Sequence, residues 1–270
     1  VFLAAVIFFG TVCTFFAEGT LLFGNPDGAR ADAECRENYL LEKKQYVLSY
    51  NASLFIPNWV TWHLCSSDLG ECSRGNDFRP DGQLPDGFYA VKKSDYQYKI
   101  YGFDRGHICP SGDRTASEEM NAQTFVMTNM QPQYHQFNGY DDSGNSGLWV
   151  RMENQLRKWA DKLSVTDTIF VCKGGTIDSE ANIITHINGK LIVPKYFYMA
   201  ILRKSSFGYA GMAFWSDQTK SWRMNETLRS HAISISELEK RTGIDFFCNL
   251  PDDVEAQVEK TFNPSVWSGL

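Results

Sequence analysis

Residues 104–110 read Asp-Arg-Gly-His-Ile-Cys-Pro and bring several chemically useful side chains next to one another. Arg105 carries a planar guanidinium that can hold a phosphate through two parallel hydrogen bonds. His107 can act as a general base near neutral pH, and the Asp104 carboxylate can orient it or charge it. Gly106 has no Cβ, so another group can approach its backbone closely. The motif alone is equally compatible with a turn around a hydrogen-bonded histidine.

A second polar cluster begins with Thr128-Asn129-Met130-Gln131-Pro132-Gln133 at the end of a predicted strand and continues at Asn145. Asn145, Trp149, Glu153 and Arg157 follow one another at intervals of four, which places them along one stripe of a helix. A carboxamide, a carboxylate and a guanidinium there suit Mg²⁺, which takes few protein oxygens and keeps water or phosphate as further ligands. In the alternative, Asn145 only caps the helix, and Glu153 and Arg157 form a surface ion pair.

The pattern of apolar residues predicts strands with a few interspersed helices. The clearest helix runs from Ser146 to Leu163, where apolar residues recur at spacings of three and four. A second helix is predicted to begin near Ser236, with Ser236 and Glu239 as a capping box, and to end at Gly243. Strands are predicted at residues 46–50, 59–64, 124–128, 168–172, 190–193, 197–202 and 209–215. Without regular alternation of strand and helix, this pattern indicates an α+β protein.

Together these segments resemble the DNA/RNA non-specific endonuclease family, whose members have a ββα-metal (His-Me finger) site and include mitochondrial endonuclease G. The likeness extends from about Asn38 to Leu250. It is carried by the two clusters above and by three further segments: Asn76-Asp77-Phe78-Arg79-Pro80-Asp81, Val193-Pro194-Lys195 and Thr242-Gly243-Ile244-Asp245-Phe246-Phe247. The resemblance implies a central antiparallel sheet flanked by helices.

The resemblance also implies a role for each matched residue. His107 would be the general base that activates water. Asn145 would be the side-chain ligand of a single Mg²⁺, for which Mn²⁺ could substitute, and Glu153 would hold metal-bound water or position the base. The other matched residues would contact phosphate or organise the site: Arg79, Arg105 and Arg157 through their guanidinium groups, Asn129 and Gln133 through their amides, and Asp104 as a supporting carboxylate.

The implied reaction is hydrolysis of phosphodiester bonds in both DNA and RNA, leaving 5′-phosphate ends. Groups that contact phosphate and metal rather than base edges give little sequence specificity. Two rival functions are a phosphodiesterase or phosphatase for small esters and a catalytically silent nucleic-acid-binding or surface module. The sequence is compatible with a monomer or a homodimer, and no segment identifies an inhibitor or immunity protein.

Two features depart from the family pattern. Residues 134–144 form a longer polar, glycine-containing insert than expected, which brings Asn138 and Asp142 close to the site in sequence. Either residue could replace Asn145 as the metal ligand. Cys109 stands where a small residue is expected, either as a small apolar substitute, which we prefer, or as half of a disulfide.

The ends and the overall charge of the chain suggest its setting. The net charge of −6 argues against a broadly basic surface but allows a small positive cleft. Val1–Ala17 contains no charged residue, which suits a signal peptide or membrane anchor better than a buried core helix. We therefore expect a leader at residues 1–24, a linker or N-terminal arm at 25–37 and one catalytic domain at 38–263. Such a protein would be secreted, periplasmic or membrane-anchored.

Six cysteines besides Cys13 could form disulfides or remain thiols, and the sequence does not decide between these states.

Overall fold

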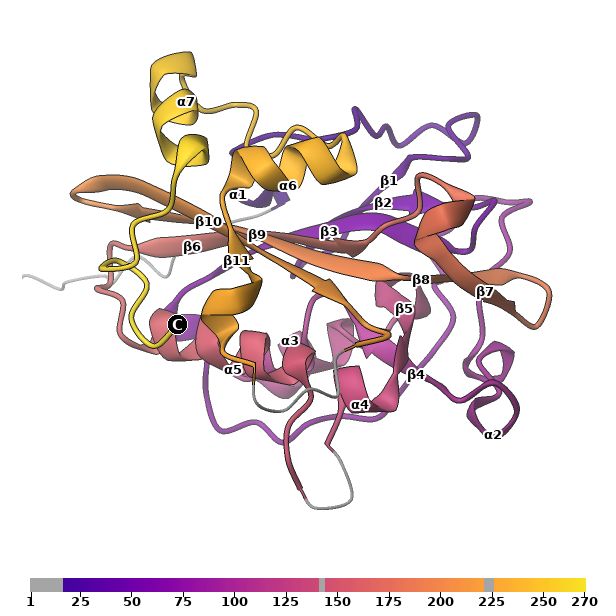
Figure 1. Ribbon diagram of the computed structural model, residues 1–270. Helices are drawn as coiled ribbons and strands as arrows, with labels where there is room; N and C mark the ends of the chain where they lie inside the picture. Colours follow the sequence, from indigo (N-terminus) through magenta and orange to yellow (C-terminus); the bar gives the residue numbers. More distant parts are fainter. Residues whose placement is uncertain (1–16, 141–143, 221–225) are drawn as a thin grey trace, which may run out of the picture.

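The computed structural model describes residues 17–140, 144–220 and 226–270 (Figure 1). Its centre is an antiparallel sheet with the strand order β1-β2-β3-β6-β9-β10-β11. These strands are β1 (Tyr39–Glu42), β2 (Val47–Asn51), β3 (Ile56–Leu64), β6 (Thr168–Gly175), β9 (Tyr196–Ser205), β10 (Gly208–Asp217) and β11 (Ala232–Ile233). Two small antiparallel sheets pair β4 (Phe103–His107) with β5 (Met130–Tyr134) and β7 (Ile183–Ile187) with β8 (Leu191–Pro194).

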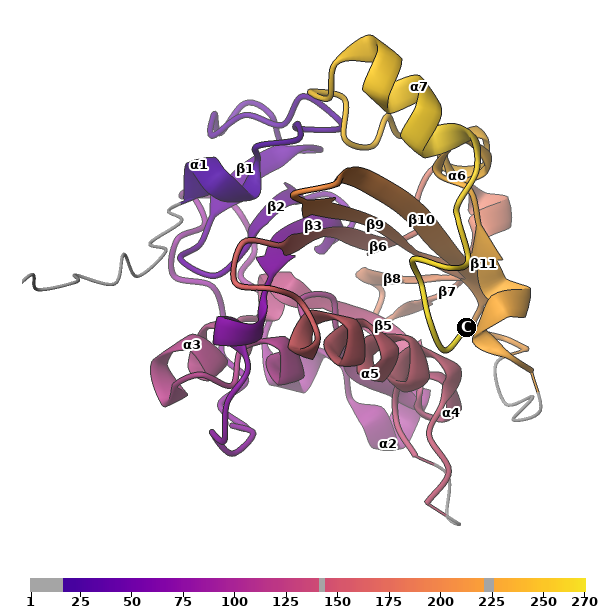
Figure 2. The same cartoon turned by 90° about the vertical axis from the view of Figure 1, so that its left-hand side faces the viewer.

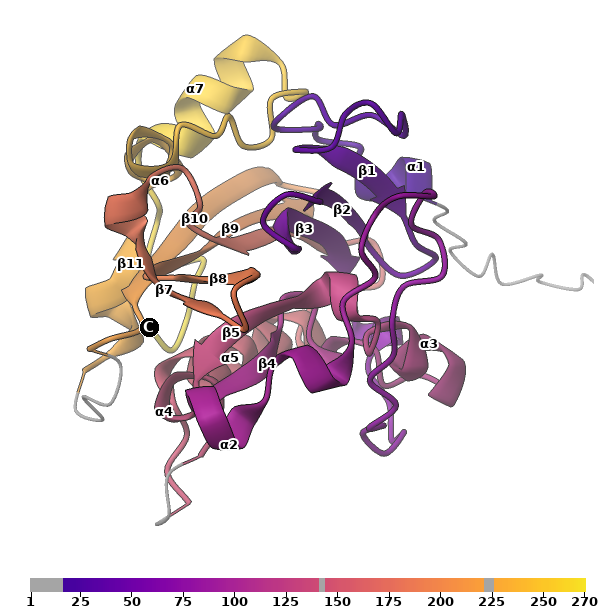
Figure 3. The same ribbon diagram turned by 90° about the vertical axis from the view of Figure 1, so that its right-hand side faces the viewer.

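Helices cover both faces of the central sheet (Figures 1 and 2). The helices of the described residues are α1 (Ala17–Thr20), α2 (Tyr98–Tyr101), α3 (Glu118–Gln123), α4 (His135–Asn138), α5 (Leu148–Asp161), α6 (Ile235–Thr242) and α7 (Asp252–Lys260). The long helix α5 lies under one face, beside the β4–β5 pair, and α6 and α7 lie on the other (Figures 2 and 3). The α+β architecture with a central antiparallel sheet is therefore confirmed.

Alternate residues of β6 face two different apolar clusters, as expected for a strand covered on both sides. Ile169 and Val171 pack in the cluster that contains the apolar face of α5. Phe170 and Cys172 point to the opposite face and pack in the cluster formed with α6 and α7. The sheet is thus buried on both faces, and the side chains of α5 that turn away from it remain available to line a site.

The structure corrects two of the predicted elements. The stretch 124–128 is not a strand, because Asn129 and Thr124 hydrogen-bond to nearby backbone and fold it into a turn, which competes with sheet pairing. The strand instead begins at Met130. The cap of α6 is Ser234, whose side chain accepts a hydrogen bond from the Glu237 backbone, so the predicted Ser236–Glu239 capping box is wrong.

The packed domain is wider than the expected residues 38–263. Phe23 is buried, and its ring lies 4.7 Å from that of Phe170 in an edge-to-face contact. Ala29 is buried in the same cluster, and Trp267 is buried at the other end of the chain. The expected leader boundary at residue 24 and the expected linker at 25–37 therefore fall within the packed part.

The export signal expected at the N-terminus lies almost entirely outside the described residues. Within the described ranges, no helix is long and apolar enough to cross a membrane. Six described cysteines are free thiols, at positions 35, 65, 72, 109, 172 and 248. Cys109 and Cys172 are buried, so Cys109 acts as the small apolar residue that we preferred for it.

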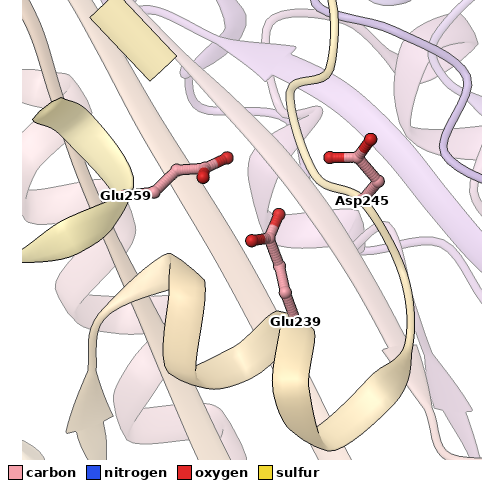
Figure 4. A group of neighbouring side chains, drawn as sticks. All are labelled: Glu239, Asp245 and Glu259. Atoms are coloured by element: carbon pink, nitrogen blue, oxygen red, sulfur yellow. The ribbon is translucent and has the colours of Figure 1, made fainter. Parts of the chain in front are cut away.

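An acidic cluster lies on the sheet face that α6 and α7 cover. Oxygen atoms of Glu239, Asp245 and Glu259 lie within 4.8 Å of one another (Figure 4). Burial raises the pKa of Glu259 to about 8, with help from the charge of Glu239. The carboxyl groups can therefore approach one another because at least one of them holds its proton near neutral pH.

The N-terminal boundary of the domain can be tested by substitution. Phe23→Ala should lower the free energy of unfolding by about 3 kcal/mol, because it empties a buried site beside Phe170. Leu22→Ala is the matched control, since the Leu22 side chain is exposed, and it should cost well under about 1 kcal/mol. Urea denaturation of both variants measures the difference. Equal, small effects would show that the domain begins after this segment.

Candidate active site

The β4–β5 pair and helix α5 together form the frame of a cleft. His107, the last residue of β4, pairs with Met130 of β5. Arg105 lies two residues before His107 and therefore on the same face of the strand. Both side chains contact Phe78, whose ring centre is 4.5 Å from the Arg105 guanidinium carbon and 5.6 Å from the His107 ring centre. The strand thus presents the base and an arginine side by side.

Residues far apart in the sequence line this cleft, which has a volume of about 310 Å³. His107 comes from β4, Asn138 from α4, and Glu153 and Arg157 from successive turns of α5. Arg74, from the loop before β4, completes the charged lining. The structure therefore brings together three of the sequence-predicted site residues, His107, Glu153 and Arg157.

His107 is held neutral by its surroundings. The side chain packs edge-on against Phe125, with ring centres 4.8 Å apart, and it is almost wholly buried. Burial lowers the pKa of His107 well below its ordinary value, and the positive charges of Arg74, Lys173 and Arg105 lower it further. Its Nε2 is buried without a hydrogen-bond partner among the described residues. At neutral pH the imidazole is therefore uncharged and able to accept a proton.

Asn129 holds the backbone that follows His107. Its amide donates to the carbonyls of Cys109 and Thr124, both at 2.9 Å, and its oxygen accepts from the Cys109 N–H at 2.8 Å. The side chain is fully buried. We therefore regard Asn129 as a positioning residue, which organises the site by holding this backbone in place.

The Gln133 side chain occupies the space that any larger residue would need at Gly106 of the Asp-Arg-Gly-His motif. Gln133 faces Asp104 in the β4–β5 register, and its buried side chain lies across the backbone of Gly106. A Cβ on Gly106 would overlap the Gln133 amide. The sequence analysis expected some group to approach the backbone of Gly106 closely. That group is the Gln133 side chain, which packs β4 and β5 together.

Two residues of α5 line the cleft, and each is held there by its own ion pair. Glu153 accepts a hydrogen bond from Lys173 of β6 at 2.6 Å, and Arg157 donates to the buried Asp113 at 2.8 Å. These pairings replace the surface ion pair between Glu153 and Arg157 that was the alternative interpretation. Both side chains are thereby tied to the protein interior and directed into the cleft.

Two loop arginines differ in their position relative to the cleft. Arg79, which the resemblance marked as a phosphate contact, pairs with the neighbouring Asp77 at 3.2 Å and is not among the cleft-lining residues. Arg74 lines the cleft, and its charge acts on His107. The sequence analysis missed Arg74 because this loop has no periodicity from which the direction of its side chains could be derived.

The structure also separates Asn138 from Asn145. Asn145 precedes Gly147, the N-cap of α5, so it does not continue the helical stripe of Trp149, Glu153 and Arg157. It is exposed and is not among the residues that line the cleft. Asn138 does line the cleft, and its Nδ2 donates to Oδ2 of Asp104 at 3.0 Å.

The described residues on either side of the segment 141–143 lie close together. The Gly147 N–H donates to the Gly139 carbonyl at 2.7 Å, and Tyr140 pairs with Ser146 across an antiparallel bridge. If residues 140–146 are left out of the count, Asn138 stands four residues before Trp149, which is the spacing that drew attention to Asn145. The spacing of four before Trp149 is therefore met by Asn145 along the sequence and by Asn138 across the adjoining residues Gly139 and Gly147.

Comparisons with known proteins show what this chain is similar to. The family described as DNA/RNA non-specific endonuclease matches residues 32–253. A nuclease from Nostoc sp. is 35% identical over 247 residues, covering 88% of this chain and 84% of that protein. The mitochondrial nuclease EXOG of Danio rerio is 32% identical over 215 residues, covering 75% of this chain and 59% of that protein. A crystal structure of an EndoG/EndoGI complex superimposes with a TM-score of 0.68 at 20% identity, covering 87% of this chain and 92% of that one.

The packing of Gln133 on Gly106 can be tested with a double mutant. Gly106→Ala should destabilise the protein by about 1–3 kcal/mol, because the buried Gln133 side chain cannot move aside freely. In a Gln133→Ala background the same substitution should cost much less, since the overlapping atoms are gone. Urea denaturation of the four proteins measures this coupling. Equal costs of Gly106→Ala in both backgrounds would contradict the packing described here.

Proposed function

The chain belongs to the DNA/RNA non-specific endonuclease family, and we propose that it cleaves DNA and RNA with His107 as general base and a single Mg²⁺ on Asn138. As a member of this family it is an enzyme that hydrolyses phosphodiester bonds. The observation that supports the assignment of residues is their convergence: His107, Asn138, Glu153 and Arg157 line one cleft from three different elements.

Asn138 fits a magnesium ligand because of the way its amide is held. A carboxylate can only accept hydrogen bonds, so Asp104 fixes the amide NH₂ group on its own side. The amide oxygen then remains as a ligand. Mg²⁺ is bound through one or two protein oxygens together with waters and substrate phosphate, and Mn²⁺ accepts similar oxygen ligands. Such an ion would stabilise negative charge on the phosphate and on the leaving oxygen.

His107 would take a proton from the attacking water. Because Nε2 is buried, Nδ1 is the nitrogen that accepts the proton, and the neutral state favoured by burial makes it available. Arg74 and Arg157 would stabilise the charge that increases on the phosphate in the transition state. Arg105 stacks on Phe78 beside the base and contributes positive potential. Glu153 would bind water at the cleft wall.

The proposed contacts involve phosphate and water, not base edges or the ribose 2′-hydroxyl. Such contacts support cleavage of both DNA and RNA with little sequence preference and with 5′-phosphate products. The net charge of −6 is compatible with this, because Arg74, Arg105, Arg157 and Lys173 gather around His107 and make the cleft locally positive.

We further propose that the protein works outside the cytoplasm, as a secreted, periplasmic or membrane-anchored enzyme. The uncharged stretch Val1–Ala17 supports this proposal through its composition. The free state of the described cysteines lends it no support. Fusion of residues 1–24 to a reporter that is active only after export tests it, and retention of the reporter in the cytoplasm would overturn it.

The choice between the two asparagines predicts opposite results for matched variants. Asn138→Ala should lower kcat roughly 100-fold or more, because the bound metal supplies several kcal/mol of transition-state stabilisation. Asn145→Ala should retain nearly full activity, and deletion of residues 140–146 should also leave an active enzyme, since Gly139 and Gly147 already adjoin. Plasmid cleavage under saturating Mg²⁺ measures all three. The reverse order of the two alanine variants would restore Asn145 as the ligand.

The lowered pKa of His107 predicts the acidic limb of the pH profile. The base is active when unprotonated, so kcat/KM should reach half its maximum below pH 6.5, the ordinary pKa of histidine. Arg74→Met removes a positive charge that disfavours protonation, and it should therefore move the acidic limb to higher pH. The matched control Arg79→Met should leave the limb in place. A wild-type limb above pH 6.5 would contradict the environment assigned to His107.

A further inference from the structure

Lys173 is a buried cation on an otherwise apolar face of the central sheet. It lies in β6, two residues after Val171 and four after Ile169, and shares their direction toward α5. Its neighbours in register are Val60 of β3 and Met199 of β9, which belong to the same apolar cluster. The side chain has no exposed surface. An ammonium group in such a place requires partners, because an unpaired buried charge is very costly.

The partners of Lys173 come from α5 and β3. Its Nζ lies 2.6 Å from Oε1 of Glu153 and 4.3 Å and 5.5 Å from the ring centres of Trp149 and Trp62. Trp149 is one helical turn before Glu153 and fully buried, so the two rings and the carboxylate enclose the ammonium group. Lys173 does not line the cleft itself, and Glu153 is the cleft-lining residue that it contacts.

Stability alone gives a weak reason for this pair. Replacing a buried ion pair by apolar side chains of similar size is often neutral or stabilising. Position 173 is surrounded by Val60, Met199 and two tryptophans, so an apolar residue would pack there. The effect of Lys173 on function is a stronger reason, because Lys173 contacts Glu153, which lines the cleft.

We propose that Lys173 is a positioning residue, which holds the Glu153 carboxylate at the cleft wall and neutralises its charge toward the phosphate substrate. A carboxylate has two oxygens, so binding Oε1 from the sheet side leaves Oε2 to accept hydrogen bonds from water in the cleft. An unpaired carboxylate would repel an anionic phosphodiester, and the ammonium group offsets that repulsion. The inference rests on the proposed nuclease function of the cleft.

Lys173→Met tests this role because it removes the charge and keeps a long, flexible apolar side chain. We expect kcat for plasmid cleavage to fall roughly 10–100-fold, as for other residues that orient a catalytic group, with a much smaller change in KM. Lys173→Arg restores a positive charge and should recover part of the loss. Arg203→Met is the control: Arg203 lies on the neighbouring strand β9 and pairs with Asp167 away from the cleft lining, so the loss of this ion pair should leave kcat unchanged.

Coupling to Glu153 distinguishes positioning from a separate effect of Lys173. If Lys173 acts through Glu153, the double variant Lys173→Met/Glu153→Gln should be no slower than Glu153→Gln alone. Multiplying losses would overturn the proposal, as would a Lys173→Met enzyme with kcat within about twofold of the wild type.

A crystal structure of Lys173→Met gives a readout that does not require activity. We expect the Glu153 carboxylate to leave its position at the cleft wall. An unmoved carboxylate would overturn the positioning role even if the variant were slow. Failure of the wild-type protein to cleave any polynucleotide would contradict the proposed function instead, and the two failures are therefore distinguishable.

Discussion

The packing of α5 on the central sheet fixes the positions of the helix side chains that enter the cleft. Leu148, Met152 and Leu156 bury one face of the helix against the strands. The neighbouring stripe of the helix carries Glu153 and Arg157, which line the same cleft as His107. Two buried ion pairs, with Lys173 and Asp113, hold these side chains in that direction. The apolar face of α5 thus stabilises its packing on the sheet, and the two ion pairs orient Glu153 and Arg157 toward the cleft.

The β4–β5 pair serves the base in the same way. Asn129 ties down the backbone after His107, and Gln133 closes the two strands over Gly106. Two aromatic rings, Phe78 and Phe125, pack against the imidazole, and its burial together with nearby cations keeps it unprotonated. The residues of the Asp-Arg-Gly-His motif therefore divide into a base, a cation, a close contact and a carboxylate that orients Asn138. The net effect is a rigid, locally positive site in an acidic protein.

The parts predictable from sequence are those with a strong period or a distinctive motif. The spacing of Leu148, Met152, Leu156 and Trp159 gave α5 nearly to its ends, and the α+β class followed from the run of strands. The strand state of Asp104–His107 could not be derived, because these residues have little strand propensity and pair only when β5 is beside them. Arg74 was missed because it lies in a loop without periodicity. Asn138 was missed as a primary site residue because residues 140–146 separate it from Trp149 in the sequence. Lys173 gave no signal because the burial of a single charged residue, just beyond the predicted strand 168–172, cannot be derived from the sequence.

The most direct measurement is cleavage of circular plasmid and of single-stranded RNA by residues 17–270, with Mg²⁺ and then with EDTA, beside His107→Ala. The account predicts cleavage of both polymers by the wild type. EDTA should abolish it, and His107→Ala should slow it by about 10²–10⁴-fold, the usual contribution of a general base. A His107→Ala enzyme that keeps the wild-type rate would contradict the assignment of the base. Intact polymers with every divalent metal, together with rapid hydrolysis of short phosphate esters, would contradict the nuclease account itself.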